Sequence, residues 1–150
     1  MKYLLPLLTI LLFSCGSDDP IGSNSIEGSY IVKSLILQNC NPESNNVNAN
    51  FSNSMDCVSN VEFEHCRSGR LIISEDNSFT STINISRRSL ILDFTLPLYS
   101  INGQGVASSA GQSLNICIDN NCDEFVIERN SYTHTYQSVG CTNIIILEKE

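Results

Sequence analysis

The sequence predicts an all-β domain with about eight antiparallel strands, folded as a sandwich or a barrel. Short β-branched and aliphatic segments recur at regular intervals between residues 28 and 148. Clusters of Asn, Asp, Gly and Ser separate these segments, as expected of turns. No stretch keeps an apolar period of 3.6 residues, so we expect little helix.

The first element of the chain is an export signal. Lys2 supplies a positive charge, and the apolar run 3–13 is shorter than the roughly 20 residues that a helix needs to span a bilayer. A short apolar run behind one Lys and ahead of small residues is typical of a cleaved secretory signal. We therefore expect residues 1–14 to be removed rather than kept as a transmembrane anchor.

The end of this signal, residues 12–16 with the letters LFSCG, resembles the bacterial lipobox. The resemblance implies that Cys15 becomes the N-terminus and carries diacylglycerol on its thiol, with a further acyl chain such as palmitate on its amino group. Several chains matter because one acyl chain alone gives only marginal, reversible membrane binding. The acidic segment 16–19 resembles the tethers of Bacteroidetes lipoproteins. The implied location is the cell envelope, with the chain anchored to the outer membrane on its periplasmic face or at the cell surface.

Residues 15–27 are then the lipidated Cys and a flexible tether, rich in Gly, Ser, Asn and Asp, and residues 28–150 form a single folded domain. Without Lys2 the mature chain has seven Lys and Arg against 16 Asp and Glu, a net charge of −9 at neutral pH. This charge argues against nucleic acid or anionic lipid as a partner of the surface. The expected membrane attachment is the lipid anchor alone.

The cysteine count predicts three disulfides. Of the seven Cys, lipidation takes Cys15 and leaves an even number in an oxidising compartment. The remaining six are Cys40, Cys57, Cys66, Cys117, Cys122 and Cys141.

The first half of the domain combines clear strands with one long connection. A β-branched first strand over 30–37 leads into the Asn-rich stretch 38–56, which has Cys40 and Cys57 at its ends. A connection of this length inside a compact domain is unusual and often functional, and we expect disulfides to hold it. A strand is expected over 58–65, where Val61, Phe63 and His65 alternate.

A hairpin about residues 75–77 follows, and its second strand, 78–86, places alternate residues on one face. These residues are Phe79, Ser81, Ile83 and Ile85. Arg87 and Arg88 are expected to form a turn, followed by an alternating strand over 90–96. Residues 97–112 are expected to be a loop with a short strand at 99–101.

The sharpest geometric inference concerns residues 114–118 and 121–128, which can pair about a two-residue turn. That register places Cys117 opposite Cys122 in a non-hydrogen-bonded pair, where Cα atoms lie about 4.5 Å apart, close enough for a disulfide. It also sets Leu114 against Phe125 on the drier face. The other four Cys allow three pairings, which stay open.

Two segments of the domain resemble the lipocalin-like lipoproteins. Gly28-Ser29-Tyr30 resembles the Gly-x-Trp start of that family, with Tyr in place of Trp, and residues 71–80 resemble its strand, acidic turn and Phe-Thr strand. The chain is expected to finish with two strands, 132–138 and 143–148, and with the terminal aliphatic strand the resemblance spans roughly residues 28–148. It implies an up-and-down antiparallel barrel whose interior can hold one small ligand.

No catalytic residue, cofactor or metal site is predicted. His65 and His134 are the two His of the chain, and neither lies in a recognisable triad pattern. His65-Cys66 lacks the paired Cys spacing of zinc sites, and an exported protein would oxidise these thiols. Residues 119–123 open like a calcium loop, but Glu124 stands where that loop needs Gly, so a hairpin turn explains them better. His134 alternates with Tyr132 and Tyr136, either as a cavity lining or as an ordinary sheet face.

The leading hypothesis is a non-enzymatic binding module that holds a small or apolar ligand inside the barrel, at residues the sequence does not identify. The alternative is a protein–protein interaction or structural lipoprotein of the cell envelope, with residues 38–57 as the contact surface. An enzyme is a third reading. The barrel interior distinguishes the first two hypotheses, because an interior filled by side chains leaves no room for a ligand. The candidates for filling it are Phe79, Leu92, Phe94 and Phe125.

Overall fold

The computed structural model describes residues 25–52, 54–138 and 140–150. Within these ranges the chain forms eleven strands and one turn of 3₁₀ helix. In chain order they are β1 (Gly28–Gln38), η1 (Glu43–Asn45), β2 (Val47–Asn50), β3 (Cys57–Ser59), β4 (Phe63–Ser68), β5 (Leu71–Ile73), β6 (Ser78–Ser89), β7 (Thr95–Ala110), β8 (Ser113–Ile118), β9 (Asn121–Glu128), β10 (Ser131–Ser138) and β11 (Cys141–Lys149).

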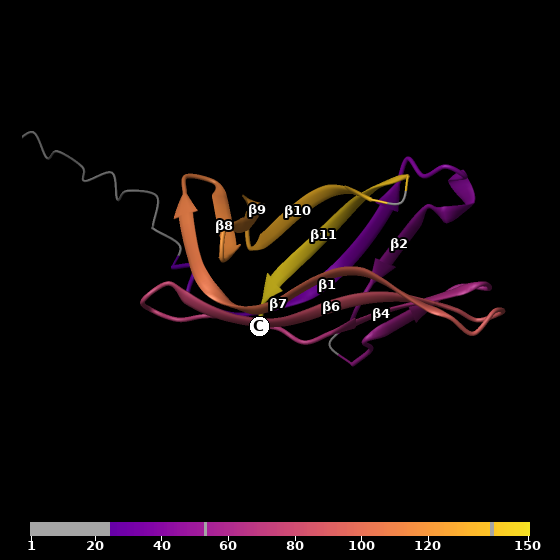
Figure 1. Ribbon diagram of the computed structural model, residues 1–150, viewed down its shortest axis with the longest axis horizontal. Helices are drawn as coiled ribbons and strands as arrows, with labels where there is room; N and C mark the ends of the chain where they lie inside the picture. The colour runs from indigo at the N-terminus through magenta and orange to yellow at the C-terminus, as the bar shows by residue number, and fades with distance from the viewer. Residues whose placement is uncertain (1–24, 53, 139) are drawn as a thin grey trace, which may run out of the picture.

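Eight of the described strands close into an antiparallel up-and-down barrel (Figure 1). The strands from β5 to β11 follow one another around it, and β1 closes it by pairing with β11 on one side and β5 on the other. The predicted fold class is therefore confirmed. The closed barrel is also consistent with the lipocalin-like fold that segments 28–30 and 71–80 imply.

The barrel is closed by strand pairing at one end and opens at the other. Near its start β1 pairs with β5, but from Ser34 to Leu37 it pairs with β2 instead. In the same way β6 pairs first with β5 and, from Asn84 to Ser89, with β4. Because β2 and β4 are not paired with each other, the two layers part toward one end. We call this the open end; it carries η1 and the β6–β7 turn and lies at the right of Figure 1.

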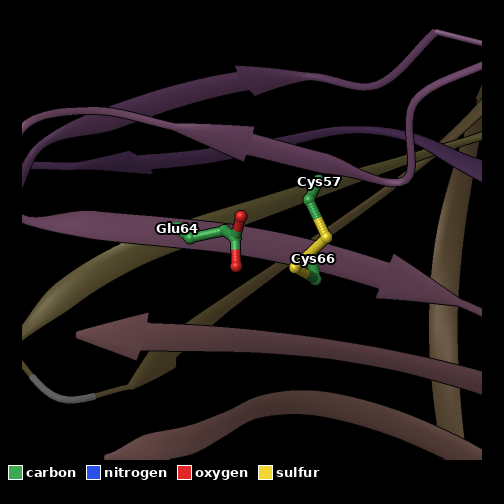
Figure 2. Close-up of side chains that lie close together, drawn as sticks. All are labelled: Cys57, Glu64 and Cys66. Carbon is green, nitrogen blue, oxygen red and sulfur yellow. A yellow bond between two sulfur atoms is a disulfide. The ribbon is translucent and has the colours of Figure 1, made fainter. Parts of the chain in front are cut away.

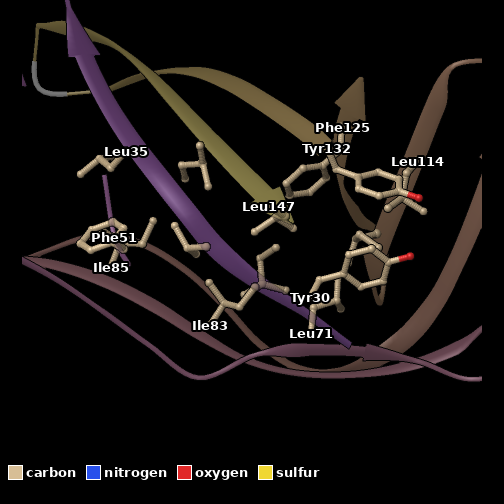
Figure 3. Packing of buried hydrophobic residues seen from close by; sticks show 14 of the residues in the cluster. Tyr30, Leu35, Phe51, Leu71, Ile83, Ile85, Leu114, Phe125, Tyr132 and Leu147 are labelled. Carbon is tan, nitrogen blue, oxygen red and sulfur yellow. The ribbon is translucent and has the colours of Figure 1, made fainter. Parts of the chain in front are cut away.

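Alternate residues of the barrel strands fill the interior with a packed apolar core (Figure 3). Phe79, Phe125 and Leu114 are almost completely buried, as period-two patterning requires. Tyr30 lies among them, its ring edge-on to Tyr132 at 5.1 Å between centroids. The Tyr30 hydroxyl donates to the carbonyl of Ile26 at 2.6 Å, and burial raises the pKa of this phenol. Tyr30 is thus a buried core residue whose hydroxyl is hydrogen-bonded.

The described residues contain three disulfides. Cys117 is bonded to Cys122 in the predicted register, with Leu114 opposite Phe125 and a Cα–Cα distance of 4.0 Å. The pairings that the sequence left open are resolved. They are Cys40–Cys141 and Cys57–Cys66. Disulfides therefore hold both ends of the Asn-rich segment, as expected, and that segment contains η1 and β2.

The β5–β6 hairpin is confirmed, and its four predicted inward residues are buried. The prediction for residues 87–112 is wrong except for the short strand at 99–101. Arg87 and Arg88 do not turn, because β6 continues to Ser89, and β7 runs for 16 residues where mainly a loop was expected. Gly105 of β7 lies opposite Phe79, and a side chain there would meet the Phe79 ring. Pairing thus holds a strand whose sequence has low strand propensity.

The expected strands over 58–65 and 90–96 are also different from the prediction. Val61 lies in the turn between β3 and β4 and is 91% exposed. Leu92 and Phe94, expected inside the barrel, lie in and beside the β6–β7 turn and are exposed. An alternation of apolar residues places side chains on one face only when the segment has a strand partner, and residues 90–94 have none.

Candidate interaction site at the open end of the barrel

Six exposed apolar side chains gather at the open end, and we call them the apolar tip. They are Val61, Leu90, Ile91, Leu92, Phe94 and Leu96. Ile91 and Leu92 are 70% and 72% exposed. Val61 joins the group because the β3–β4 turn contacts the β6–β7 turn, where the Leu90 amide donates to the carbonyl of Glu62 at 2.8 Å. Exposed apolar clusters of this kind mark contact surfaces in soluble domains.

Ser89 gives the tip its shape. Its hydroxyl accepts hydrogen bonds from the amides of Ile91 and Leu92, at 3.3 and 3.1 Å, and its own amide donates to the carbonyl of Phe94. Asp93 has a φ of 47°, which closes the turn, and its carboxylate pairs with Arg88 at 3.3 Å. The turn therefore holds its apolar side chains outward without apolar support. The sequence contained a signal for this: three successive apolar residues, 90–92, cannot all face one core.

Two polar side chains lie just behind the tip, of which His65 is buried and Arg87 half-buried. His65 is 1% exposed, and its Nε2 has no hydrogen-bond partner among the described residues. Burial, followed by the charge of Arg87, lowers the pKa of His65 to about 4, so the ring is neutral. Arg87 lies opposite His65 on β6, with its guanidinium 3.5 Å from the centre of the Phe63 ring and 3.2 Å from the Asn45 side-chain oxygen. Burial lowers the pKa of Arg87 as well.

Arg67, a further polar residue of this region, is buried and bridges the gap between β1 and β4, which are not paired with each other. Its guanidinium donates to the carbonyl of Val32, to the carbonyl of Ser52 at 2.9 Å and to the Asp56 carboxylate at 3.2 Å. These bonds join β1, β4 and the β2–β3 connection across a gap that lacks strand pairing. Arg67 is satisfied by these partners, which gives it a structural role.

The His134 stripe predicted on β10 faces inward, where it joins Tyr99 of β7 in an aromatic cluster. Pairing of β9 with β10 stops at Thr133, and beyond it the His134 Nδ1 lies 2.8 Å from the carbonyl of Glu124. The Tyr99 hydroxyl donates to Asp123 at 2.9 Å. Burial, then the Asp123 charge, raises the pKa of Tyr99.

The same two causes raise the pKa of Tyr136 to about 12, and its hydroxyl donates to the carbonyl of Leu98. Both phenols therefore stay protonated at neutral pH and act as donors. The cluster connects β7, β9 and β10 beyond the point where the pairing of β9 with β10 ends. This is a structural role. No nucleophile is placed against His134 among the described residues.

The barrel interior bears on the hypothesis of an enclosed ligand. Hollows of about 590, 560, 300 and 210 Å³ occur among the described residues. Tyr30, Phe79 and Phe125 line none of them. The two largest are lined mainly by charged and polar residues near the end of β11. The barrel could bind a ligand; of its buried core residues, Tyr132 borders one of these hollows and Ile101 and Ile116 border another, while Phe79 and Phe125 are almost completely buried.

The side chains of Cys57, Glu64 and Cys66 lie close together, and the atoms that could bind a metal ion are within 4.8 Å of one another (Figure 2). The two sulfurs are bonded to each other, so neither is available as a thiolate. Asp119 and Asn120 form the β8–β9 turn, as the hairpin reading of the calcium-like segment expected.

The predicted signal 1–14, Cys15 and most of the tether lie outside the described residues, so their lipidation stays a prediction. Across the part of the chain that the structure describes, no helix has the length and apolar character needed to span a membrane. Comparison with protein-family models, with curated proteins and with solved structures finds no match to this chain.

Proposed function

We propose that this chain is a lipid-anchored, non-enzymatic interaction module of the bacterial cell envelope. Its apolar tip inserts into an apolar pocket on a partner protein. The observation that carries the proposal is the tip itself: ordered apolar side chains such as Ile91 and Leu92 stand in solvent at the end of a stable barrel. Exposed side chains of this type gain most from burial against a partner.

The position of the tip supports this reading. The described chain begins at Ser25, next to the closed end, and β6 runs from the closed end to the tip over 12 residues. At ~3.3 Å per residue this strand spans on the order of 35 Å. A lipid on Cys15 attaches the tether to the closed end, so the tip lies a full barrel length from the point of attachment.

Charge favours a protein over a bilayer as the occupant. The chain carries a net charge of −8, and anionic lipid repels such a surface. Arg88, the exposed cation beside the tip, is already paired with Asp93. The filled barrel interior favours surface recognition over an enclosed ligand, because a ligand there would have to displace Phe79 and Phe125.

The test uses the full lipoprotein in its own cells, with the photo-crosslinking residue p-benzoylphenylalanine in place of Leu92. The matched control has the same residue in place of Val106, which is 61% exposed on β7 away from the tip. We expect a discrete protein adduct from position 92 and none from position 106. With the partner purified, Leu92→Asp should weaken binding about tenfold or more, since burial of Leu contributes ~1.5–3 kcal/mol.

The same adducts from both positions would show that the tip is not a specific contact. Binding of the purified protein to phosphatidylethanolamine–phosphatidylglycerol vesicles, lost in Leu92→Asp, would replace the protein partner with a bilayer. Either outcome would overturn the proposal.

A further inference from the structure

The strands β2 and β3 are the two edges of the sheet, and each pairs with one neighbour only among the described strands. They belong to one chain segment, which turns back on itself between Ser52 and Met55 through an isolated antiparallel bridge. A hairpin thus begins at this bridge. Farther from the bridge, β2 and β3 do not pair with each other; β2 pairs with β1 and β3 with β4.

Hydrogen-bond parity shows which backbone groups of β2 point away from β1. The Phe51 amide donates to the carbonyl of Lys33 at 2.9 Å, so these two residues form a hydrogen-bonded pair. Antiparallel ladders alternate such pairs with non-hydrogen-bonded ones. Ala49 and Val47 therefore also direct their backbone groups at β1. Asn48 and Asn50 direct theirs at the outer edge.

The same reasoning applies to β3. The Asn60 amide donates to the carbonyl of Phe63, and the Arg67 amide donates to the carbonyl of Asp56, both at 2.8 Å. Because hydrogen-bonded pairs alternate along the ladder, Val58 also directs its backbone groups at β4. Cys57 and Ser59 direct theirs at the outer edge. The Cys57–Cys66 disulfide fits this assignment, because disulfides bridge non-hydrogen-bonded pairs.

These two edges face one hollow. Continuing the register of the Ser52–Met55 bridge sets Asn48 opposite Ser59 and Asn50 opposite Cys57. The structure instead has a hollow of about 210 Å³ there, which we call the slot. It is lined by Asn46, Val47, Asn48, Ala49, Val58, Ser59, Asn60 and His65. Asn48 of β2 and Ser59 of β3, two of the four residues with outward backbone groups, thus border the slot.

The floor of the slot contains one buried polar atom that lacks a partner. His65 is 1% exposed and lines the slot, and its Nε2 makes no hydrogen bond among the described residues. Arg87 lies opposite His65 on β6 but does not line the slot, and it donates to the Asn45 side-chain oxygen. A buried ring nitrogen without a partner favours a polar group from outside the chain.

We infer that the slot binds an extended peptide segment of a partner protein by strand addition. The peptide backbone pairs with Asn48 and Asn50 of β2, or with Cys57 and Ser59 of β3, and one polar side chain of the peptide reaches His65 on the floor of the slot. Main-chain pairing supplies affinity in such complexes, and alternate side chains supply specificity. Because each edge offers two residues, the paired stretch is only about five residues long. This inference concerns a different surface from the apolar tip and goes beyond the proposed function.

The test uses the full chain in detergent and a phage library that displays random decapeptides. Enriched peptides are synthesised with a terminal Trp, whose fluorescence is unobscured because the chain has no Trp. Asn48→Pro and Ser59→Pro each remove one outward amide from an exposed edge position, where Pro is tolerated. Asn48→Ser and Ser59→Thr keep the amide and serve as matched controls.

We expect at least one Pro variant to weaken binding of the enriched peptides tenfold or more, with both controls binding as the wild type does. Amide exchange at Asn48, Asn50, Cys57 and Ser59 should slow when the peptide is added. This second readout does not depend on how well the Pro variants fold. Failure to enrich any peptide overturns the inference. So does binding that Leu92→Asp removes and the Pro variants leave unchanged, because such peptides occupy the apolar tip.

Discussion

At the scale of single residues, His65 shows how the fold tolerates a polar group in its interior. The alternation that ends at His65 predicted a strand, and His65 is buried in β4. Burial removes water from the ring, and Arg87 beside it disfavours a second positive charge. The pKa of His65 therefore falls from 6.5 to about 4, and folding requires the neutral ring.

His65 should make the protein less stable in mild acid. Below pH 6.5 the unfolded chain protonates His65 and the folded chain does not, so the free energy of unfolding falls as the pH drops from 6.5 to 4. The full loss is about 3 kcal/mol. We expect a steeper decline between pH 7 and 4.5 in the wild type than in His65→Gln, measured by urea unfolding. A comparison at pH 8 isolates the pH-independent cost of the substitution. Equal declines in both proteins would contradict the assignment.

Some of these residues were predictable and others were not. The partner of Cys117 follows from a two-residue turn, because local register is set by turn length. Arg87 was assigned to a turn, since two successive Arg suggest exposure. Its burial depends on Phe63 and Asn45, which lie far away in the sequence. Long-range contacts of this kind have no local signal.

At the scale of elements, the β5–β6 and β8–β9 hairpins were predicted well, and the β3–β4 and β6–β7 hairpins were missed. The β5–β6 and β8–β9 turns contain Asp and Asn, residues that adopt turn conformations readily. The β6–β7 turn instead contains the apolar residues 90–92, which were interpreted as part of a strand. The local evidence for that turn is this run of three apolar residues and Ser89, whose hydroxyl accepts from two amides. The candidate site was missed for the same reason.

The three disulfides should differ in their contributions to stability. Cys40–Cys141 closes a separation of 101 residues, against 5 for Cys117–Cys122. A longer loop removes more entropy from the unfolded chain, with an expected stabilisation of about 4–5 kcal/mol for the first and about 2 kcal/mol for the second. Replacement of each pair by Ser, followed by urea unfolding, measures the two values. A larger loss from the Cys117–Cys122 pair would show that loop entropy does not dominate here.

At the scale of the whole molecule, the barrel was predictable in class but not in its particular shape. Strand number, turn spacing and the resemblance at residues 28–30 and 71–80 pointed to closure. The strands β2, β3 and β4 lie outside the closed ring of eight strands. Their position depends on the hydrogen bonds of Arg67 and on two disulfides. Neither the pairing of these Cys nor the partners of Arg67 can be derived from sequence spacing.

The filled interior predicts the outcome of native mass spectrometry. The chain in the lipidated form proposed above, released from detergent, should have the mass of that form less six hydrogens, without an apolar adduct. Phe125→Ala should cost about 3–5 kcal/mol, because it opens a cavity in a packed core. An adduct that organic solvent removes, together with a small cost for Phe125→Ala, would restore the enclosed-ligand hypothesis.

The ladder between β1 and β11 also determines when the protein can finish folding. β1 contains the first residues of the barrel and β11 the last, and they pair from Tyr30–Lys149 to Gln38–Thr142. Until β11 has been synthesised, one side of β1 has no partner and its aliphatic side chains are exposed to other nascent chains. Proteins dominated by such distant pairings fold slowly. The short Cys57–Cys66 and Cys117–Cys122 links can oxidise early, whereas Cys40–Cys141 forms only as the barrel closes. Growth conditions that slow thiol oxidation should therefore lower the yield of this protein by aggregation rather than by loss of secondary structure.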